Sequence, residues 1–86
     1  MQEFVDRQLY KRYVSVIAHC DREGKVMPLV IEWENQKKYR IDRILEIRPA
    51  ASQVGGGGIL YRVRIGSQER RLFYENYRWF IESYTP

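Results

Sequence analysis

The last third of the chain alternates apolar and polar side chains with a period of two. From Ile59 to Ile65, every second residue is apolar, and Arg62 and Arg64 fall between them. Successive side chains of an extended strand point to opposite faces, whereas a helix repeats every 3.6 residues. The pattern therefore predicts a strand with one buried face and restricts this part of the chain to a sheet.

Two further segments after residue 69 have the composition of a hairpin. Arg70–Glu75 and Arg78–Ser83 flank Asn76-Tyr77, which fits a two-residue turn. In that register every cross-strand pair is chemically compatible. Trp79 and Ile81 would then point into the core. The predicted pairs are Tyr74 with Trp79, Phe73 with Phe80, Leu72 with Ile81, and Arg71 with Glu82.

The first half of the chain predicts three more strands, rich in β-branched and aromatic residues. They are Tyr13–Cys20, Val26–Glu34 and Tyr39–Arg48. Gly24 supplies the positive φ that a hairpin turn needs after Cys20. Pro28 has no amide donor, so it should lie at an edge, at a bulge or at the start of its strand.

The third of these strands is irregular. Ile41 and Ile44 fall on opposite faces, so we expect a bulge near Asp42-Arg43, or burial of both faces at a bend. Pro49 should end the strand. Residues 49–58, PAASQVGGGG, predict a flexible glycine-rich loop or a crossing between two parts of the sheet.

These segments predict one all-β domain spanning residues 1–86. The fold class expected is a small, strongly bent antiparallel meander, an SH3-like barrel of five to six strands, with an open curled sheet as the second choice. Residues 1–11 would form either a loose N-terminal arm or a short helix with Phe4, Val5 and Leu9 on one face.

Catalytic and metal-binding residue sets are missing from the sequence. His19 and Cys20 are the only histidine and cysteine; as neighbours on a strand they point apart and cannot form a dyad. We expect a surface His19 beside a small buried Cys20. Gly55–Gly58 lacks the Lys-Ser/Thr of a phosphate loop. We therefore predict a non-enzymatic protein with no catalytic residues, no metal and no cofactor.

Charge and the N-terminal sequence suggest a location. The net charge is +4, and eleven of the fifteen cationic residues are arginine, which binds phosphate and carboxylate bidentately. Charges interrupt the apolar residues of the first segment, MQEFVDRQLYKRY, so it does not resemble a signal peptide. No stretch is apolar enough to predict a membrane span. A cytoplasmic protein is the expectation.

The favoured binding surface is the arginine and aromatic face of the C-terminal sheet. Arginines on a curved sheet with exposed aromatic rings are typical of single-stranded nucleic-acid binding. The alternative is a second apolar layer in which the rings are buried and the arginines pair with Glu69, Glu75 and Glu82. The predicted nucleic-acid-binding residues are Arg62, Arg64, Arg70, Arg71, Phe73 and Phe80.

Two other functions remain open. A protein–protein adaptor or homo-oligomer would pair through an uncovered edge strand, particularly near Pro28, or through an apolar patch that includes Phe4, Tyr10 and Tyr13. An enzyme would require a deep pocket with convergent carboxylates. Glu32-x-Glu34 is the nearest approach to such a pair, and a solvated strand face explains it more simply.

A resemblance covers residues 12–83. The string ILYRVRIGSQERRLFYENYRWFIES, preceded by a glycine-rich loop, is similar to a family of small uncharacterised bacterial β-domains. The upstream sequence is similar too: it has Pro28-Leu29, a strand that ends near Trp33, a short turn, and then Tyr39-x-Ile41-x-x-Ile44. Related domains lie beside or are fused to lesion-bypass DNA polymerases, so the resemblance implies a DNA-processing protein as partner. It supplies no catalytic residue.

Overall fold

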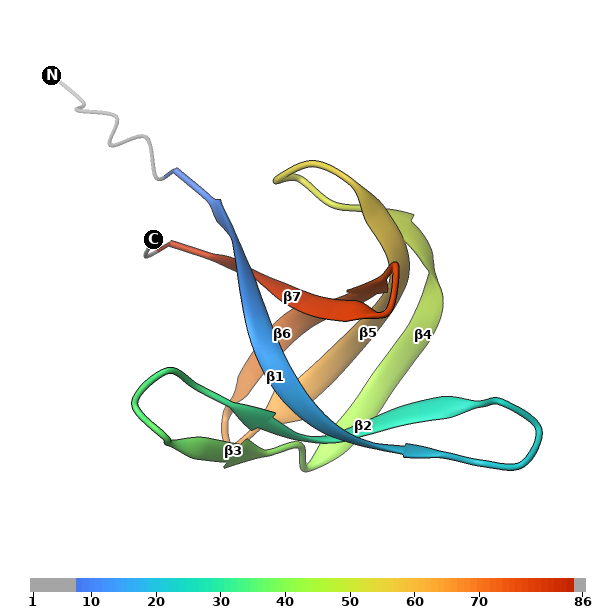
Figure 1. Ribbon diagram of the computed structural model, residues 1–86. Coiled ribbons are helices and arrows are strands. Elements are labelled where there is room, and N and C mark those ends of the chain that lie inside the picture. Colours follow the sequence, from blue (N-terminus) through green and yellow to red (C-terminus); the bar gives the residue numbers. More distant parts are fainter. Residues whose placement is uncertain (1–7, 85–86) are drawn as a thin grey trace, which may run out of the picture.

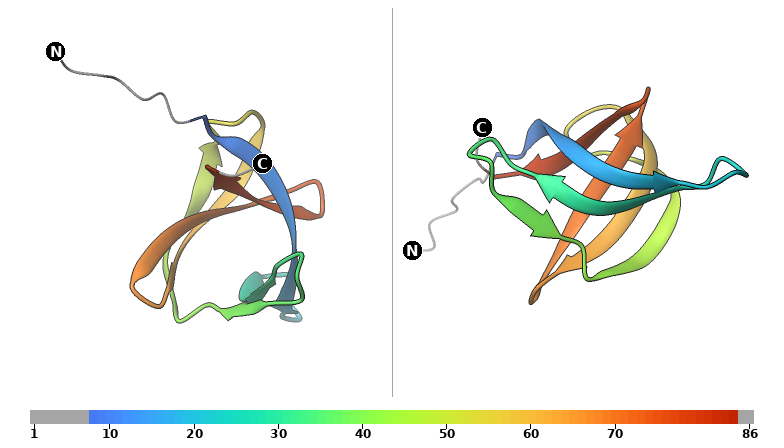
Figure 2. Two further views of the ribbon diagram at one scale, coloured as in Figure 1. Left: turned by 90° about the vertical axis from the view of Figure 1, so that its left-hand side faces the viewer. Right: turned by 60° about the horizontal axis from the view of Figure 1, so that its bottom comes forward.

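Seven antiparallel strands form one sheet in the computed structural model, which describes residues 8–84 (Figure 1). Their order across the sheet is β3-β2-β1-β7-β6-β5-β4, and the sheet curls strongly into a half-barrel (Figure 2). The all-β, strongly bent antiparallel prediction is confirmed, with seven strands instead of five or six. The strands are β1 (Tyr10–Cys20), β2 (Val26–Glu32), β3 (Lys38–Arg40), β4 (Arg43–Ala51), β5 (Gly57–Ile65), β6 (Gln68–Glu75) and β7 (Arg78–Ser83).

Strand β1 joins the two halves of the sheet by changing its partner midway. Its first half, Tyr10–Val14, pairs with β7, and its second half, Ser15–Cys20, pairs with β2. Tyr10 and Lys11 thus belong to a strand, so the arm-or-helix prediction for residues 1–11 is wrong at these positions. Residues 1–7 of that prediction lie outside the described part of the chain.

The strand predicted over residues 39–48 is divided at the place where an irregularity was expected. β3 ends at Arg40 and β4 begins at Arg43. The amide of Ile41 donates to the Leu29 carbonyl at 2.9 Å, and the amide of Asp42 donates to the Arg64 carbonyl at 2.9 Å. Two consecutive residues therefore bond to opposite ends of the sheet. The link therefore joins β2 and β5, the strands next to the two edges of the curled sheet.

The predicted flexible loop over 49–58 is wrong at both ends, because β4 continues through Pro49 to Ala51 and β5 begins at Gly57. Proline is tolerated here because β4 is an edge strand. The glycines serve close packing: a Cβ on Gly58 would lie 2.4 Å from the Tyr74 carbonyl oxygen. Only residues 52–56 connect the two strands.

Pro28 occupies a β-bulge, one of the positions predicted for it. Ile17 lies opposite Val30 and Ala18 opposite Pro28, so Leu29 is the extra residue. β3 pairs only with Val30–Glu32, and no strand between residues 8 and 84 pairs with Val26–Pro28 on that side.

The prediction of a buried Cys20 is wrong: the residue is exposed. Pairing between β1 and β7 stops at Val14. The end of the β1–β2 hairpin therefore projects beyond the sheet, where no other strand covers it (Figure 1).

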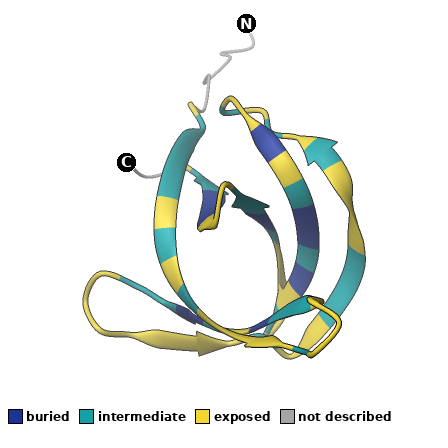
Figure 3. Cartoon of the chain, turned by 45° about the vertical axis from the view of Figure 1, so that its right-hand side comes forward, coloured by how far each residue is buried: buried dark blue, intermediate teal, exposed yellow. Residues whose placement is uncertain are grey.

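The main core fills the concave side of the sheet with residues from β2, β5, β6 and β7. Most buried residues lie on β5, β6 and β7 (Figure 3). The Tyr61 and Trp79 rings lie 5.2 Å apart, and the Tyr61 hydroxyl donates to the Val26 carbonyl at 2.6 Å. Burial raises the pKa of the Tyr61 phenol. The inward placement predicted for Trp79 and Ile81 is confirmed. The buried members are Ile31, Tyr61, Val63, Leu72, Trp79 and Ile81.

The convex face holds a second, smaller cluster of Leu60, Phe73 and Phe80. The two phenylalanine rings stack with centroids 5.0 Å apart and planes 8° apart. They lie opposite each other across β6 and β7, which confirms the predicted register of this hairpin. Ala50 and Val54, from the β4–β5 hairpin, pack on the cluster. The sheet thus buries apolar side chains on both faces.

Tyr77 in the β6–β7 turn is strained and makes little contact. Its φ is 64°, in the left-handed region, and 91% of the residue is exposed. We expect Tyr77→Gly to raise the free energy of unfolding by about 0.5–1 kcal/mol, because glycine adopts this φ without a Cβ clash. Denaturant titration measures it. Tyr77→Ala is the matched control: it removes the ring and keeps the strain, so an equal gain there would contradict the explanation.

Glu75 anchors the start of β5. Its carboxylate accepts from the Gly57 amide at 2.7 Å and lies 3.4 Å from Lys11 Nζ. The Gly57 hydrogen bond and then Lys11 hold the pKa of this carboxyl below its ordinary value. A lowered folded-state pKa stabilises the fold above the unfolded-state pKa, and that contribution is lost as pH falls through the folded-state value.

We expect the free energy of unfolding to fall as the pH drops below about 4.3, the ordinary glutamate pKa. Glu75→Gln should lower stability near pH 7 and flatten this part of the pH profile. Lys11→Met is the control: it leaves the Gly57 hydrogen bond and should keep most of the slope. Chemical denaturation at several pH values measures it, and an unchanged slope in Glu75→Gln would refute the role.

Candidate nucleic-acid interface

Three of the four predicted arginines share the convex face of the sheet. Arg62 lies opposite Arg71 across β5 and β6, and Arg64 lies opposite Glu69. Arg70 lies opposite Val63, whose side chain is in the concave core, so Arg70 belongs to the other face. Alternation along β6 separates Arg70 from Arg71. The structure thus brings together Arg62, Arg64 and Arg71.

Two of these arginines are neutralised within the chain. Arg62 Nη1 lies 2.9 Å from Glu69 Oε1, and Arg71 Nη2 lies 3.8 Å from Glu82 Oε1. Both glutamates are among the partners predicted by the alternative in which this face is a second apolar layer. Partly exposed ion pairs of this kind contribute little to stability, yet they reduce the positive charge offered to a ligand.

The predicted aromatic platforms are not accessible. Phe73 and Phe80 are both 0% exposed. The exposed-ring expectation is wrong, and the alternative of a second apolar layer is confirmed. Ala50 and Val54 cover this cluster from the β4–β5 hairpin, which the sequence suggested was a mobile loop. A base could stack on these rings only after that hairpin moved away.

Arg43 is the residue that sequence reasoning missed. It lies directly opposite Arg64 across β4 and β5, and both residues are exposed. Neither forms an ion pair with any residue between 8 and 84. The neighbouring Asp42 carboxylate accepts from the Gly66 amide at 2.6 Å. A register shift between Ile44 and Glu46 creates this pairing, so simple alternation did not reveal it.

The convex side of β4 and β5 is consequently rich in positive charge. Four arginines and one glutamate lie on it, and we call the four the arginine ladder. Glu46 serves two of them: its Oε1 is 2.7 Å from Arg48 Nε and 4.0 Å from Arg62 Nε. The hydrogen bond from Arg48 lowers the pKa of Glu46, with both arginine charges adding to it. The ladder consists of Arg43, Arg48, Arg62 and Arg64.

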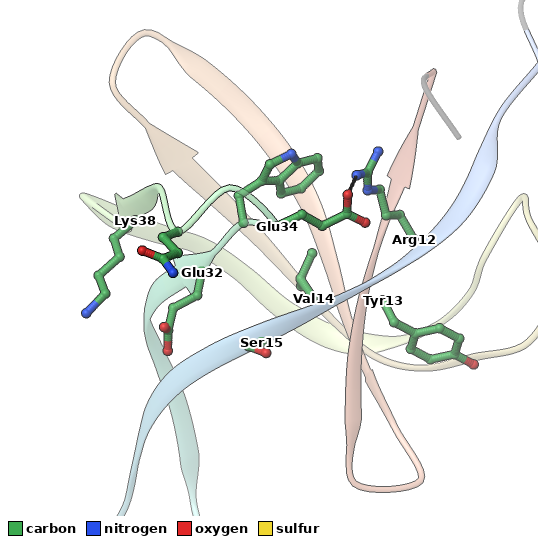
Figure 4. Close-up of a pocket in the computed structure, with 9 residues that line it drawn as sticks. Arg12, Tyr13, Val14, Ser15, Glu32, Glu34 and Lys38 are labelled. Carbon is green, nitrogen blue, oxygen red and sulfur yellow. Dashed lines mark ion pairs between the residues drawn. The ribbon is translucent and has the colours of Figure 1, made fainter.

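A separate cleft of about 630 Å³ lies between β1 and the β2–β3 connection. Arg12 stacks 4.5 Å above the Trp33 ring and lies 2.7 Å from Glu34 Oε2. Figure 4 shows Glu34 directed at Arg12, whereas Glu32 points away from it. The two carboxylates of Glu32-x-Glu34 therefore do not converge. Between residues 8 and 84, no group of three or more His, Cys, Asp or Glu side chains could hold a metal ion.

Comparison of the chain with protein-family models, curated proteins and solved structures finds no match. Within the described strands and turns there is no helix long and apolar enough to cross a membrane.

Proposed function

We propose that this domain is a non-enzymatic module that binds single-stranded nucleic acid through its phosphates, using the arginine ladder of β4 and β5. One observation carries the proposal: Arg43 and Arg64 face each other across the two strands, both exposed, with no ion-pair partner in the described chain. Like charges directly opposite each other destabilise a sheet. A phosphate between them would remove that repulsion.

The shape of the ladder favours one backbone. Neighbouring strands lie about 4.8 Å apart, so a ladder two strands wide offers room for a single row of phosphates. Guanidinium groups bind phosphate oxygens bidentately, which makes arginine better suited than lysine to this task. With Phe73 and Phe80 buried, binding would depend on charge and not on stacking. We therefore expect it to be independent of sequence and sensitive to salt.

The wider proposal places the protein in the cytoplasm as an accessory to a DNA-processing protein, in keeping with the resemblance to bacterial β-domains found beside lesion-bypass polymerases. An SH3-like barrel is the proposed fold type. The link at Ile41-Asp42 supports it, since these two residues bond to the two ends of the sheet and draw them together.

A protein–protein adaptor is the second candidate, and one observation favours it. Among the strands of residues 8–84, only β7 pairs with Tyr10–Val14 of β1, and the side of β1 away from β7 borders the cleft lined by Trp33. An extended peptide could add there as a further strand. Binding of this kind would survive moderate salt, which distinguishes it from phosphate binding.

We expect the double variant Arg43→Gln/Arg64→Gln to bind fluorescein-labelled single-stranded DNA or RNA about tenfold more weakly at low salt. The slope of log affinity against log salt should fall by about 1.4, since each lost phosphate contact on a single strand contributes about 0.7. Fluorescence anisotropy at several salt concentrations measures both quantities.

Arg22→Gln/Lys25→Gln is the matched control, because it removes the same charge from the projecting β1–β2 turn and should change binding far less. Arg62→Gln/Arg71→Gln should also have a smaller effect, because Glu69 and Glu82 already offset these cations. No binding by the wild type at low salt, or an equal loss in the Arg22/Lys25 control, would reject the ladder as the binding surface.

A further inference from the structure

Strand β4 is a long sheet edge that no other described strand covers. It pairs with β5 on one side and lies last in the sheet, so its other side is unpaired within residues 8–84. Natural edge strands are commonly very short, or are blunted by charges and bulges. β3, at the opposite edge, has three residues, whereas β4 has nine. The register shift that disturbs β4 lies between Ile44 and Glu46, so Glu46–Ala51 pairs regularly with β5. Within this stretch Pro49 has no amide to donate.

The middle of this edge has a self-complementary sequence. Glu46 and Arg48 flank Ile47 and lie on the convex face, opposite Arg62 and Leu60 of β5. Ile47 lies opposite Tyr61, on the concave side, yet 42% of it is exposed. The side chains of Arg48 and Glu46 are 53% and 40% exposed. An apolar residue between opposite charges is thus available along an open edge.

We propose that two copies of this chain associate by antiparallel pairing of their β4 edges, with the two-fold axis at Ile47. In this register each Glu46 lies opposite Arg48 of the second copy, and the two exposed Ile47 side chains meet at the axis. Directly opposed residues of opposite charge stabilise an antiparallel pair. The pairing would also satisfy part of the backbone groups along this edge. Pro49, opposite Leu45 of the second copy in this register, has no amide to donate.

Symmetry makes this register distinctive. In a two-fold interface the same patch meets itself, so each contact occurs twice. Glu46 and Arg48 already lie 2.7 Å apart within one chain, and each would gain a second partner of opposite charge. Arg48 belongs to both the ladder and this edge, but the pairing does not use Arg43 or Arg64, which carry the nucleic-acid proposal.

Charge reversal tests the register. In Glu46→Arg each introduced arginine would face Arg48 of the second copy, and in Arg48→Glu two glutamates would face each other, so each variant alone should dissociate. We expect the dimer dissociation constant to rise about tenfold or more, since two favourable pairs become repulsive. Mixing the two variants in equal amounts should restore a dimer, because every opposed pair is then of opposite charge.

Sedimentation equilibrium across a dilution series measures the association, and circular dichroism melting checks that each variant folds. The double variant Glu46→Arg/Arg48→Glu keeps its charges complementary and should dimerise like the wild type. Arg22→Glu, in the projecting turn, should dimerise unchanged. A wild-type monomer of constant mass at all concentrations, or a mixture that stays monomeric, would overturn the proposal. Anisotropy with the Arg43/Arg64 variant still tests nucleic-acid binding if dimerisation fails.

Discussion

The strong curl of one sheet is the constraint on which the rest of this structure depends. A chain of 86 residues is long enough for one modest core. A single flat sheet with no second layer would leave one apolar face in water. Curling folds the concave face onto itself, so Trp79 and Tyr61 pack together across the middle strands. The change of partner along β1 and the link at Ile41-Asp42 hold that curvature.

The convex face of the sheet has an apolar part and a charged part. Near β6 and β7 it is apolar, with Phe73 and Phe80 stacked and covered by the β4–β5 hairpin. Toward β4 and β5 it is charged, and its arginines differ in whether a carboxylate lies near them. Arg71 and Arg62 have carboxylate partners, whereas Arg64 and Arg43 face each other. The buried half stabilises the domain, which leaves the charged half available for a ligand.

Composition alone predicts the wrong roles for the glycine run and for Pro49 in this fold. A run of four glycines ordinarily indicates mobility. In this fold Gly57 and Gly58 lie in β5, where backbone of Ala50 and Tyr74 approaches too closely for a Cβ. Pro49, which ordinarily ends a strand, lies within an edge strand. Both features depend on neighbours that are distant in sequence, or on the place of a strand in the sheet.

Local pattern determined much of this protein by itself. Alternation in residues 59–65 and the complementary pairs of the last hairpin predicted the all-β class, the register of β6 and β7, and which residues face the core. These depend on strand periodicity and a two-residue turn, both properties of short segments. Alternation along β6 already separates Arg70 from Arg71. Only the tertiary structure decided that Phe73 and Phe80 are covered and that Arg43 meets Arg64. The covering of the rings and the meeting of Arg43 with Arg64 depend on how β4 lies against β5. A register shift at Leu45 reverses the alternation there; the broken period of two indicated an irregularity near Asp42-Arg43 but not its position at Leu45.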